Sequence, residues 1–198
     1  MPFDVISSAT MVERDLNAVW EWFDYRRGVL SELQPNPAHY ALAEWQDQFS
    51  EFTLVTQNVD GLHVKAGSRD VIEVHGSIWR SRCLSCGSRF GLMADEARFD
   101  SCPSCGERVR PDVVLFGEML PMDAYERAAK AASECDLCFV IGTSALVYPA
   151  ASLPEIAKHH GAFVVEVNPE RTPLSDLCNE VLTGKAGEIV PLLNKTSL

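Results

Sequence analysis

The stretch Leu137-Cys138-Phe139-Val140-Ile141-Gly142-Thr143-Ser144 places five consecutive apolar residues directly before a glycine and two hydroxyl residues. An unbroken apolar run, without the alternation of a half-exposed strand, is typical of a strand buried on both faces of a parallel sheet. Residues 163–167 largely repeat the pattern and end at Asn168-Pro169. Two such strands predict an α/β fold in which helices cover both faces of the sheet.

The flanking segments have the periodicity expected of the same fold. Helices are predicted at 11–33, 39–49 and 123–133, and further short strands at 52–56, 71–74 and 113–116. Pro35-Asn36-Pro37 separates the first two helices, because proline breaks a helix. This alternation of strands and helices predicts a Rossmann-like parallel sheet, in which ligands bind beyond the carboxyl ends of the strands.

Polar residues follow the predicted strands at the point where each strand ends. They are Gln57–Asp60, His75, Gly142–Ser144 and Asn168. We expect them to line a ligand site, since strand ends meet at one edge of a parallel sheet. The backbone amides and hydroxyls of Gly142–Ser144 suit a phosphate or a ribose, although Thr143 or Ser144 could equally cap a following helix.

Four cysteines form two pairs with the spacing of zinc knuckles. Cys83-Leu84-Ser85-Cys86 and Cys102-Pro103-Ser104-Cys105 are separated by fifteen residues, and Gly87 and Gly106 follow directly. Each knuckle turn presents two thiolates and favours a residue that tolerates positive φ. Because four thiolates leave no open coordination position, we predict one structural Zn²⁺ per chain. The site defines a zinc-ribbon module over residues 80–110, inserted into a Rossmann-like domain of residues 1–79 and 111–198.

The other three cysteines are expected to be core residues. Cys135 and Cys138 repeat the knuckle spacing, but only Cys178 remains to partner them. Cys138 also begins an apolar strand, where a free cysteine behaves as a small hydrophobic residue. A redox role for one of the earlier pairs would leave the other pair unexplained.

Composition restricts the partners and the compartment. The chain has 198 residues and a formal net charge of −11, which argues against general nucleic-acid binding despite five arginines near the knuckles (Arg80, Arg82, Arg89, Arg108 and Arg110). No apolar stretch is long enough to span a bilayer. Seven cysteines without a secretory signal indicate a reducing, cytoplasmic environment.

Several short motifs occur in a fixed order along the chain. They are Thr56–His63 (TQNVDGLH), Glu73–Ser77 (EVHGS), the two cysteine pairs, Arg110–Glu118 (RPDVVLFGE), Gly142–Ser144 and Val167–Glu170 (VNPE). As an ordered set, extending from roughly Val19 to Leu193, they closely resemble the sirtuin family. The resemblance implies NAD-dependent removal of acyl groups from the lysines of a protein or peptide substrate, with release of nicotinamide and O-acyl-ADP-ribose.

The resemblance assigns His75 as the general base acting on the ribose hydroxyls. An imidazole suits this role because its ordinary pKa lies near neutrality, although a lone histidine after a strand is more often structural. The implied NAD contacts are Gln57 at a ribose; Asn58 and Asp60 at the nicotinamide carboxamide; Gly142, Thr143 and Ser144 at phosphate or ribose; Asn168, Pro169 and Glu170 at the adenosine ribose; and Ala186 beside adenine.

The resemblance also implies a groove for the substrate. The segment containing Val114, Phe116, Gly117 and Glu118 would pair with the peptide as an added strand, with Phe116 as the wall of the acyl-lysine tunnel or as a plain core aromatic. Family members that remove succinyl or malonyl groups carry a tyrosine and an arginine three residues apart, and here Phe23 and Arg26 occupy those positions. Arg26 could pair with an acyl carboxylate, whereas Phe23 lacks the hydroxyl. Acetyl is therefore expected, with succinyl or malonyl as alternatives.

One family segment has no counterpart in these residues. Sirtuins carry a GAGxS-type turn and a GIPDFR motif ahead of the matched region, and no GxGxxG occurs either. The parallel sheet is therefore expected to lack its first strand, and NAD binding by these 198 residues to be weak. Two alternatives follow: a non-catalytic module that keeps the peptide groove, and a zinc-ribbon interaction protein.

Overall fold

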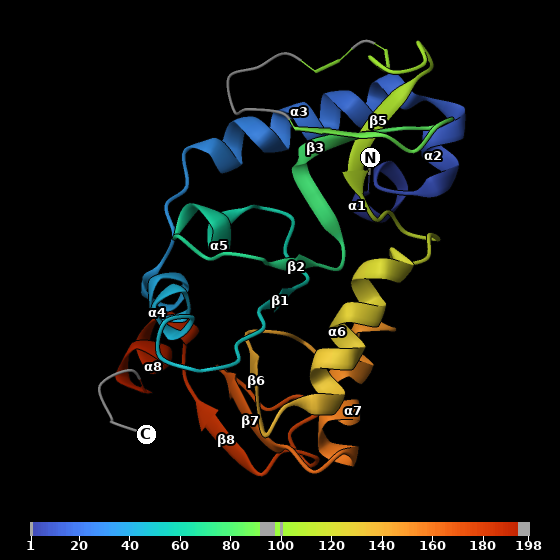
Figure 1. The fold of residues 1–198 in the computed structure, drawn as a ribbon. Helices are drawn as coiled ribbons and strands as arrows, with labels where there is room; N and C mark the ends of the chain where they lie inside the picture. The colour runs from blue at the N-terminus through green and yellow to red at the C-terminus, as the bar shows by residue number, and fades with distance from the viewer. Residues whose placement is uncertain (1, 92–97, 100, 194–198) are drawn as a thin grey trace. The chain divides into compact units, whose positions relative to one another are not determined.

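The structure, a computed structural model, describes residues 2–91, 98–99 and 101–193. They form two compact units, each assembled from separate parts of the sequence (Figure 1). The first unit contains Met1–Leu33, Thr56–Gly61 and His75–Pro121, and the second contains Gln34–Val55, Leu62–Val74 and Met122–Leu198.

The first unit combines three N-terminal helices with an antiparallel sheet. The helices are α1 (Phe3–Ile6), α2 (Ala9–Arg14) and α3 (Leu16–Ser31), and the sheet has the order β4-β3-β5, with β3 at Gly76–Cys83, β4 at Arg89–Gly91 and β5 at Val109–Val113. The prediction of one helix over 11–33 is wrong, because Asp15 has an extended φ of −153°. Its carboxylate accepts the Ala18 amide at 3.0 Å and so begins a new helix.

The inner face of α3 builds the core of this unit. Val19 and Phe23 pack with buried residues of α1, α2, β3 and the end of β5. One turn away, Trp20 packs against Cys83, Cys102 and Val109. A single helix therefore supports both the sheet and the cysteine turns.

The second unit contains the predicted parallel sheet. Its order is β6-β7-β8, with β6 at Leu137–Ile141, β7 at Phe163–Asn168 and β8 at Glu180–Thr183. Its helices are α4 (Pro37–Trp45), α5 (Leu62–Lys65), α6 (Met122–Glu134), the 3₁₀ turn η1 (Ala150–Ser152), α7 (Leu153–His159) and α8 (Ala186–Leu193). The predictions of β6, of β7, of α6 and of a parallel sheet are confirmed, but only β7 is largely buried, and β8 and α8 were not predicted.

Helices cover both faces of this parallel sheet (Figure 1). Val165 and Val167 of β7 pack with α4 and α8, whereas Val164 packs on the opposite side with Ala157 of α7. Side chains alternate along a strand, so Glu166 lies on the Val164 side. Cys135, Cys138 and Cys178 pack against the same apolar cluster, and burial raises the pKa of Cys138 to about 12. These three cysteines are partly buried and pack against the core, so the prediction that they are core residues is confirmed only in part.

The remaining predicted strands are shorter than expected. Residues 52–56 reduce to β1 (Val55–Thr56) and residues 71–74 to β2 (Ile72–Glu73), which pair with each other. Residues 114–116 lie beyond the end of β5, yet their backbone is held: the Val114 amide donates to the His75 carbonyl and the Phe116 amide to the Ser7 carbonyl, both at 2.9 Å.

Gly76 lies where β3 begins, in a left-handed conformation with φ of +76°. A Cβ at this position would lie 2.0 Å from the carbonyl oxygen of Asp112, so only glycine fits. We expect Gly76→Ala to lower the free energy of unfolding by more than about 2 kcal/mol, because conformational strain adds to a backbone clash. Urea unfolding measures this loss.

Gly161→Ala is the matched control, because Gly161 also has positive φ, of +98°, but open space around its Cα. It should lose only about 1 kcal/mol, the cost of the left-handed conformation alone. Equal losses in the two variants would show that the approach to Asp112 is unimportant.

Candidate active site and zinc centre

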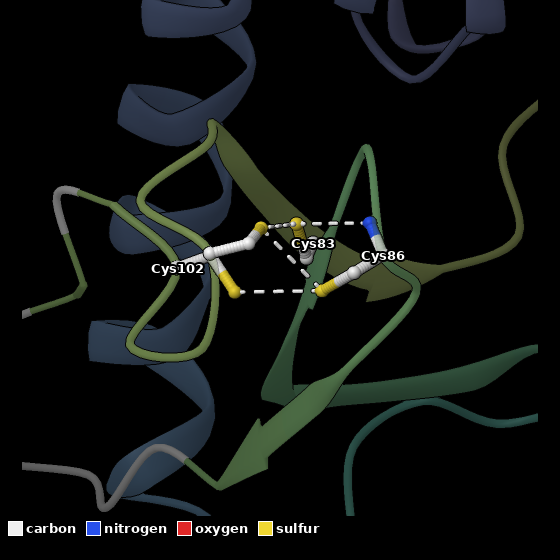
Figure 2. A group of neighbouring side chains, drawn as sticks. Cys83, Cys86 and Cys102 are labelled. Carbon is white, nitrogen blue, oxygen red and sulfur yellow. Dashed lines mark hydrogen bonds between the residues drawn. The ribbon is translucent and has the colours of Figure 1, made fainter.

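The four cysteines of the two knuckles converge on one point. Their Sγ atoms all lie within 4.8 Å of one another, and Figure 2 shows the labelled sulfurs pointing toward a common centre. Cys83 at the end of β3 and Cys102 are buried, whereas Cys86 and Cys105 lie at the surface. The spacing prediction is therefore confirmed as a compact four-sulfur cluster.

Backbone hydrogen bonds shape the first knuckle for a metal. The Cys83 sulfur accepts the amides of Ser85 and Cys86, each at 3.4 Å, and these bonds, chiefly that of Cys86, lower the pKa of Cys83. Ser88, through its hydroxyl and its amide, lowers the pKa of Cys86 to about 6. Against a backbone hydrogen bond from Glu107, burial and neighbouring sulfurs raise the pKa of Cys105 to about 12, so the fit to a structural zinc rests on the convergence of the four sulfurs rather than on these pKa values.

Main-chain hydrogen bonds close the second knuckle. The Cys102 amide donates to the Glu107 carbonyl at 2.7 Å, and the Gly106 amide donates to the Cys102 carbonyl at 2.8 Å. Gly87 and Gly106 have φ of +73° and +79°, the conformation expected of them from the sequence. Both turns rest on Trp20, whose indole N–H donates to the Val109 carbonyl at 3.0 Å.

One hydrogen bond orients the His75 ring, and a second fixes the His75 main chain. Its Nδ1 lies 2.9 Å from the Gln57 carbonyl oxygen, and its own carbonyl accepts the Val114 amide. A carbonyl only accepts, so Nδ1 must carry the proton and Nε2 is left with its lone pair. The ring is half-buried. This arrangement presents Nε2 as a proton acceptor.

The loop over Thr56–Gly61 lies beside His75 in the first unit and is tied to β3. The Val59 carbonyl accepts the Ile78 amide at 2.9 Å, and the Asp60 carbonyl accepts the Trp79 indole N–H at 2.6 Å. The Asn58 amide donates to Thr56 Oγ1 at 3.1 Å, while the Asn58 residue itself is exposed. The structure thus places Gln57 against His75, with Asn58 and Asp60 on the same loop.

A buried ion pair shapes the segment after β5. Arg110 binds both carboxylate oxygens of Glu118, and Glu118 also accepts the Leu115 amide at 2.9 Å. The Phe116 backbone pairs on both sides with the N-terminal segment, donating to Ser7 and accepting from Ala9. The Phe116 ring is half-exposed and meets Phe3 edge-on at 5.7 Å.

The two α3 residues proposed to select the acyl group have different environments. Phe23 is buried in the apolar core of the first unit. Arg26 is partly exposed, and its guanidinium lies 5.9 Å from the Trp22 ring centre. Within the described part of the chain, Arg26 has no carboxylate partner.

The other predicted NAD contacts lie in the second unit, at the carboxyl ends of its strands. The Gly142 amide donates to the Val167 carbonyl at 2.9 Å, and Asn168 Nδ2 donates to the Thr143 carbonyl at 2.9 Å. The Thr143 hydroxyl accepts the Ala145 amide at 3.2 Å, a local turn rather than a helix cap, since the next helical turn begins at Ala150. Pro169 and Glu170 follow β7, and Ala186 begins α8.

Two features of this unit were missed in the sequence. Glu166 is buried on β7 and binds the hydroxyls of Thr172, at 2.5 Å, and Ser175, which fixes the loop after Asn168. A lone glutamate in an apolar strand could have signalled it. Leu146, Val147 and Tyr148 are consecutive exposed apolar residues just after Ser144. Their apolar run before Pro149 was the available signal.

Removing one buried zinc ligand tests the metal centre. Purified protein should contain about one zinc per chain, and Cys102→Ser should lose both the metal and folding stability, because a structural site couples binding to folding. Cys178→Ser is the matched control and should keep the zinc, since Cys178 lies in a different apolar cluster. Freshly prepared, reduced wild-type protein without zinc by atomic emission would contradict the assignment.

No helix among the residues that the structure describes is long and apolar enough to cross a membrane.

Comparisons with known proteins agree on one family. Residues 3–149 match the model of the Sir2 family. An NAD-dependent protein deacylase of Thermus thermophilus is 51% identical over 184 residues, which cover 91% of this chain and 72% of the relative. One from Aquifex aeolicus is 46% identical over 175 residues, which cover 87% of this chain and 73% of the relative.

Solved structures show the same likeness. A Sir2 homologue in complex with NAD superposes with a TM-score of 0.90 at 42% identity, covering 96% of this chain and 75% of that one. A Sir2 protein bound to an acetylated peptide gives a TM-score of 0.85 at 28% identity, covering 95% and 81% of the two chains. Family model, sequence identity and fold thus lead to one conclusion: this chain belongs to the Sir2 family, the sirtuins.

Proposed function

We propose that this protein is an NAD-dependent protein-lysine deacylase that releases nicotinamide and O-acyl-ADP-ribose. The observation that carries the proposal is the fixed His75 ring, whose Nδ1 is held by the Gln57 carbonyl so that Nε2 accepts a proton. Relatives about half identical in sequence are named NAD-dependent protein deacylases. This family membership favours an enzyme over a non-catalytic peptide-binding module or a zinc-ribbon interaction protein.

When bound, NAD supplies the ribose carbon that the acyl-lysine oxygen attacks and the nicotinamide that leaves. His75 would remove a proton from a ribose hydroxyl, so that its oxygen could take up the acyl carbon while the bond to the lysine nitrogen breaks and the free amine leaves. The Nδ1 contact with the Gln57 carbonyl keeps the imidazole in the tautomer required for this step, and the Val114 amide fixes the main chain of His75. Residues 1–79 and 111–198 form the NAD-binding domain in this proposal, and residues 80–110 form the zinc module.

The remaining NAD contacts follow from the chemistry of each side chain. Asn58 and Asp60 suit the nicotinamide carboxamide, which both donates and accepts hydrogen bonds, and Gln57 suits a ribose. In the second unit, Gly142–Ser144 suits phosphate or ribose, Asn168–Glu170 the adenosine ribose, and Ala186 the adenine face. The Asn168 bond to the Thr143 carbonyl supports this group, because it joins two of the proposed contacts.

The peptide groove is proposed at Val114–Glu118. Arg110 and the Leu115 amide engage the Glu118 carboxylate, and the Phe116 backbone is paired with Ser7 and Ala9. Because the Val114 amide is paired with the His75 carbonyl, the peptide would meet the Val114 carbonyl, the backbone of Gly117 and the exposed Phe116 ring. Backbone pairing of this kind makes little demand on the substrate sequence.

Replacing the proposed base tests the chemistry. His75→Ala should lower the deacylation rate on the order of 10²–10⁴-fold, since general-base catalysis contributes that much, while the zinc content stays unchanged. Nicotinamide release from NAD and an acetyl-lysine peptide provides the measurement. The control is His160→Ala, because His160 is exposed and its Nδ1 also faces a main-chain carbonyl, that of Ile156. Near-normal turnover by the His75 variant would show that another residue is the base.

Calorimetric titration of NAD into the wild-type protein accompanies this test. Saturable binding together with turnover supports the deacylase. Peptide binding without any NAD binding would instead support the non-catalytic module.

Arg26 offers a test of acyl choice. Arg26→Met keeps an apolar contact with Trp22 but removes the charge, so it should weaken desuccinylation relative to deacetylation by about tenfold, the scale of a charge-assisted hydrogen bond. The ratio of kcat/KM for succinyl and acetyl peptides is the readout. Equal losses on both substrates would remove Arg26 from acyl selection.

A further inference from the structure

One face of the β4-β3-β5 sheet carries an excess of arginine around a single carboxylate. Arg80 and Arg82 lie two residues apart on β3, Arg89 of β4 pairs directly opposite Arg82, and Asp112 lies on β5. Side chains two residues apart, and those directly opposite, share a face. The Asp112 carboxylate lies 3.1 Å from Arg80, 3.2 Å from Arg89 and 4.0 Å from Arg82.

The charges in this cluster do not balance. The Asp112 side chain is only 6% exposed, whereas those of Arg82 and Arg89 are 32% and 46% exposed. One carboxylate offers about four acceptor positions, and each guanidinium carries about five N–H donors. Within the described residues, neither Arg82 nor Arg89 has another acidic partner. One arginine is enough to neutralise the Asp112 carboxylate. Among the described residues, pairing with Asp112 therefore leaves this arginine cluster with excess positive charge.

This cationic face is unusual for the chain, whose formal net charge is −11. The buried Asp112 carboxylate lies against the Arg80 and Arg89 guanidinium groups, with Arg82 further away at 4.0 Å, and this contact reduces the conformational entropy lost on binding an anion. Their outward N–H groups suit carboxylates, because charge-assisted and bidentate pairs are favourable there. The chemistry of the face therefore fits an acidic polypeptide segment.

The strand that carries Asp112 leads directly into the proposed peptide groove. β5 runs directly into Val114–Glu118, and Asp112 precedes Val114 by about 7 Å along an extended chain. Arg110, on the same strand, binds Glu118 at the far end of that segment. A peptide paired with Val114–Glu118 would carry its neighbouring residues toward the arginines.

We propose that Arg82 and Arg89, held in place by Asp112, bind acidic residues that flank the acyl-lysine, so that the preferred substrates are acidic near the modified lysine. This inference rests on the proposed deacylase function and names a substrate class for it. Partly exposed pairs contribute modestly, so the preference adjusts kcat/KM rather than deciding activity.

Three acetyl-lysine peptides test the proposal, and they differ only at the three positions before and the three positions after the lysine. The neutral peptide has glutamine at all six positions. One acidic peptide has glutamate at the three positions before the lysine, and the other has glutamate at the three positions after it. Wild-type protein should favour one acidic peptide over the neutral one by about three- to tenfold in kcat/KM, and the preference should shrink as salt is raised. In Arg82→Gln/Arg89→Gln the acidic-to-neutral ratio should fall to about one. Arg14→Gln is the control, an exposed arginine at the end of α2 and outside the sheet, and it should keep the preference.

The outcomes separate the two proposals. If no peptide is deacylated, the proposed function fails. Fluorescence anisotropy of the same peptides, labelled, then measures whether the wild-type protein binds acidic peptides more tightly than the neutral one, which tests the role of the arginines without catalysis. Equal kcat/KM for acidic and neutral peptides in the wild-type protein would overturn the inference. A preference that survives in the double variant would also overturn it, provided that zinc content and melting temperature show that the variant is folded.

Discussion

The close approach of Gly76 to the Asp112 carbonyl is the constraint on which the proposed catalytic unit depends. It lets the start of β3 lie against the end of β5 without a side chain between them. The neighbouring residue, His75, can then accept the Val114 amide, and its ring reaches the Gln57 carbonyl. The proposed base, the Thr56–Gly61 loop and the proposed peptide segment are therefore ordered by this one close approach of two backbones.

Buried charge organises both units beyond the apolar core. Arg110 and Glu118 shape the peptide segment in the first unit, and Glu166 with two hydroxyls shapes the loop after β7 in the second. A buried charge is costly unless hydrogen bonds surround it, and removing one partner leaves the other unsatisfied. These groups therefore specify the conformation of the two loops. Apolar packing alone is less directional and would specify it less precisely.

Prediction from the sequence succeeded where the signal is local. The zinc cluster follows from the spacing of its cysteines, and β6 follows from an unbroken apolar run. The single helix over 11–33 failed because its apolar spacing continues through Asp15, whose capping role depends on backbone geometry. β8 was missed because Glu180–Thr183 is short and begins with a charged residue. The arginines around Asp112 were visible only as a basic run, since their shared partner lies about thirty residues from Arg80 in sequence and becomes a neighbour through strand pairing.

The Trp20 hydrogen bond to Val109 has a consequence for synthesis on the ribosome. Its two partners are 89 residues apart, so α3 emerges long before the cysteine turns and β5 that its inner face must contact. Translation at roughly 5–20 residues per second leaves that apolar face uncovered for several seconds. During this interval a nascent chain is a natural client for a chaperone, and metal capture by the second knuckle coincides with the moment when the helix can first be covered.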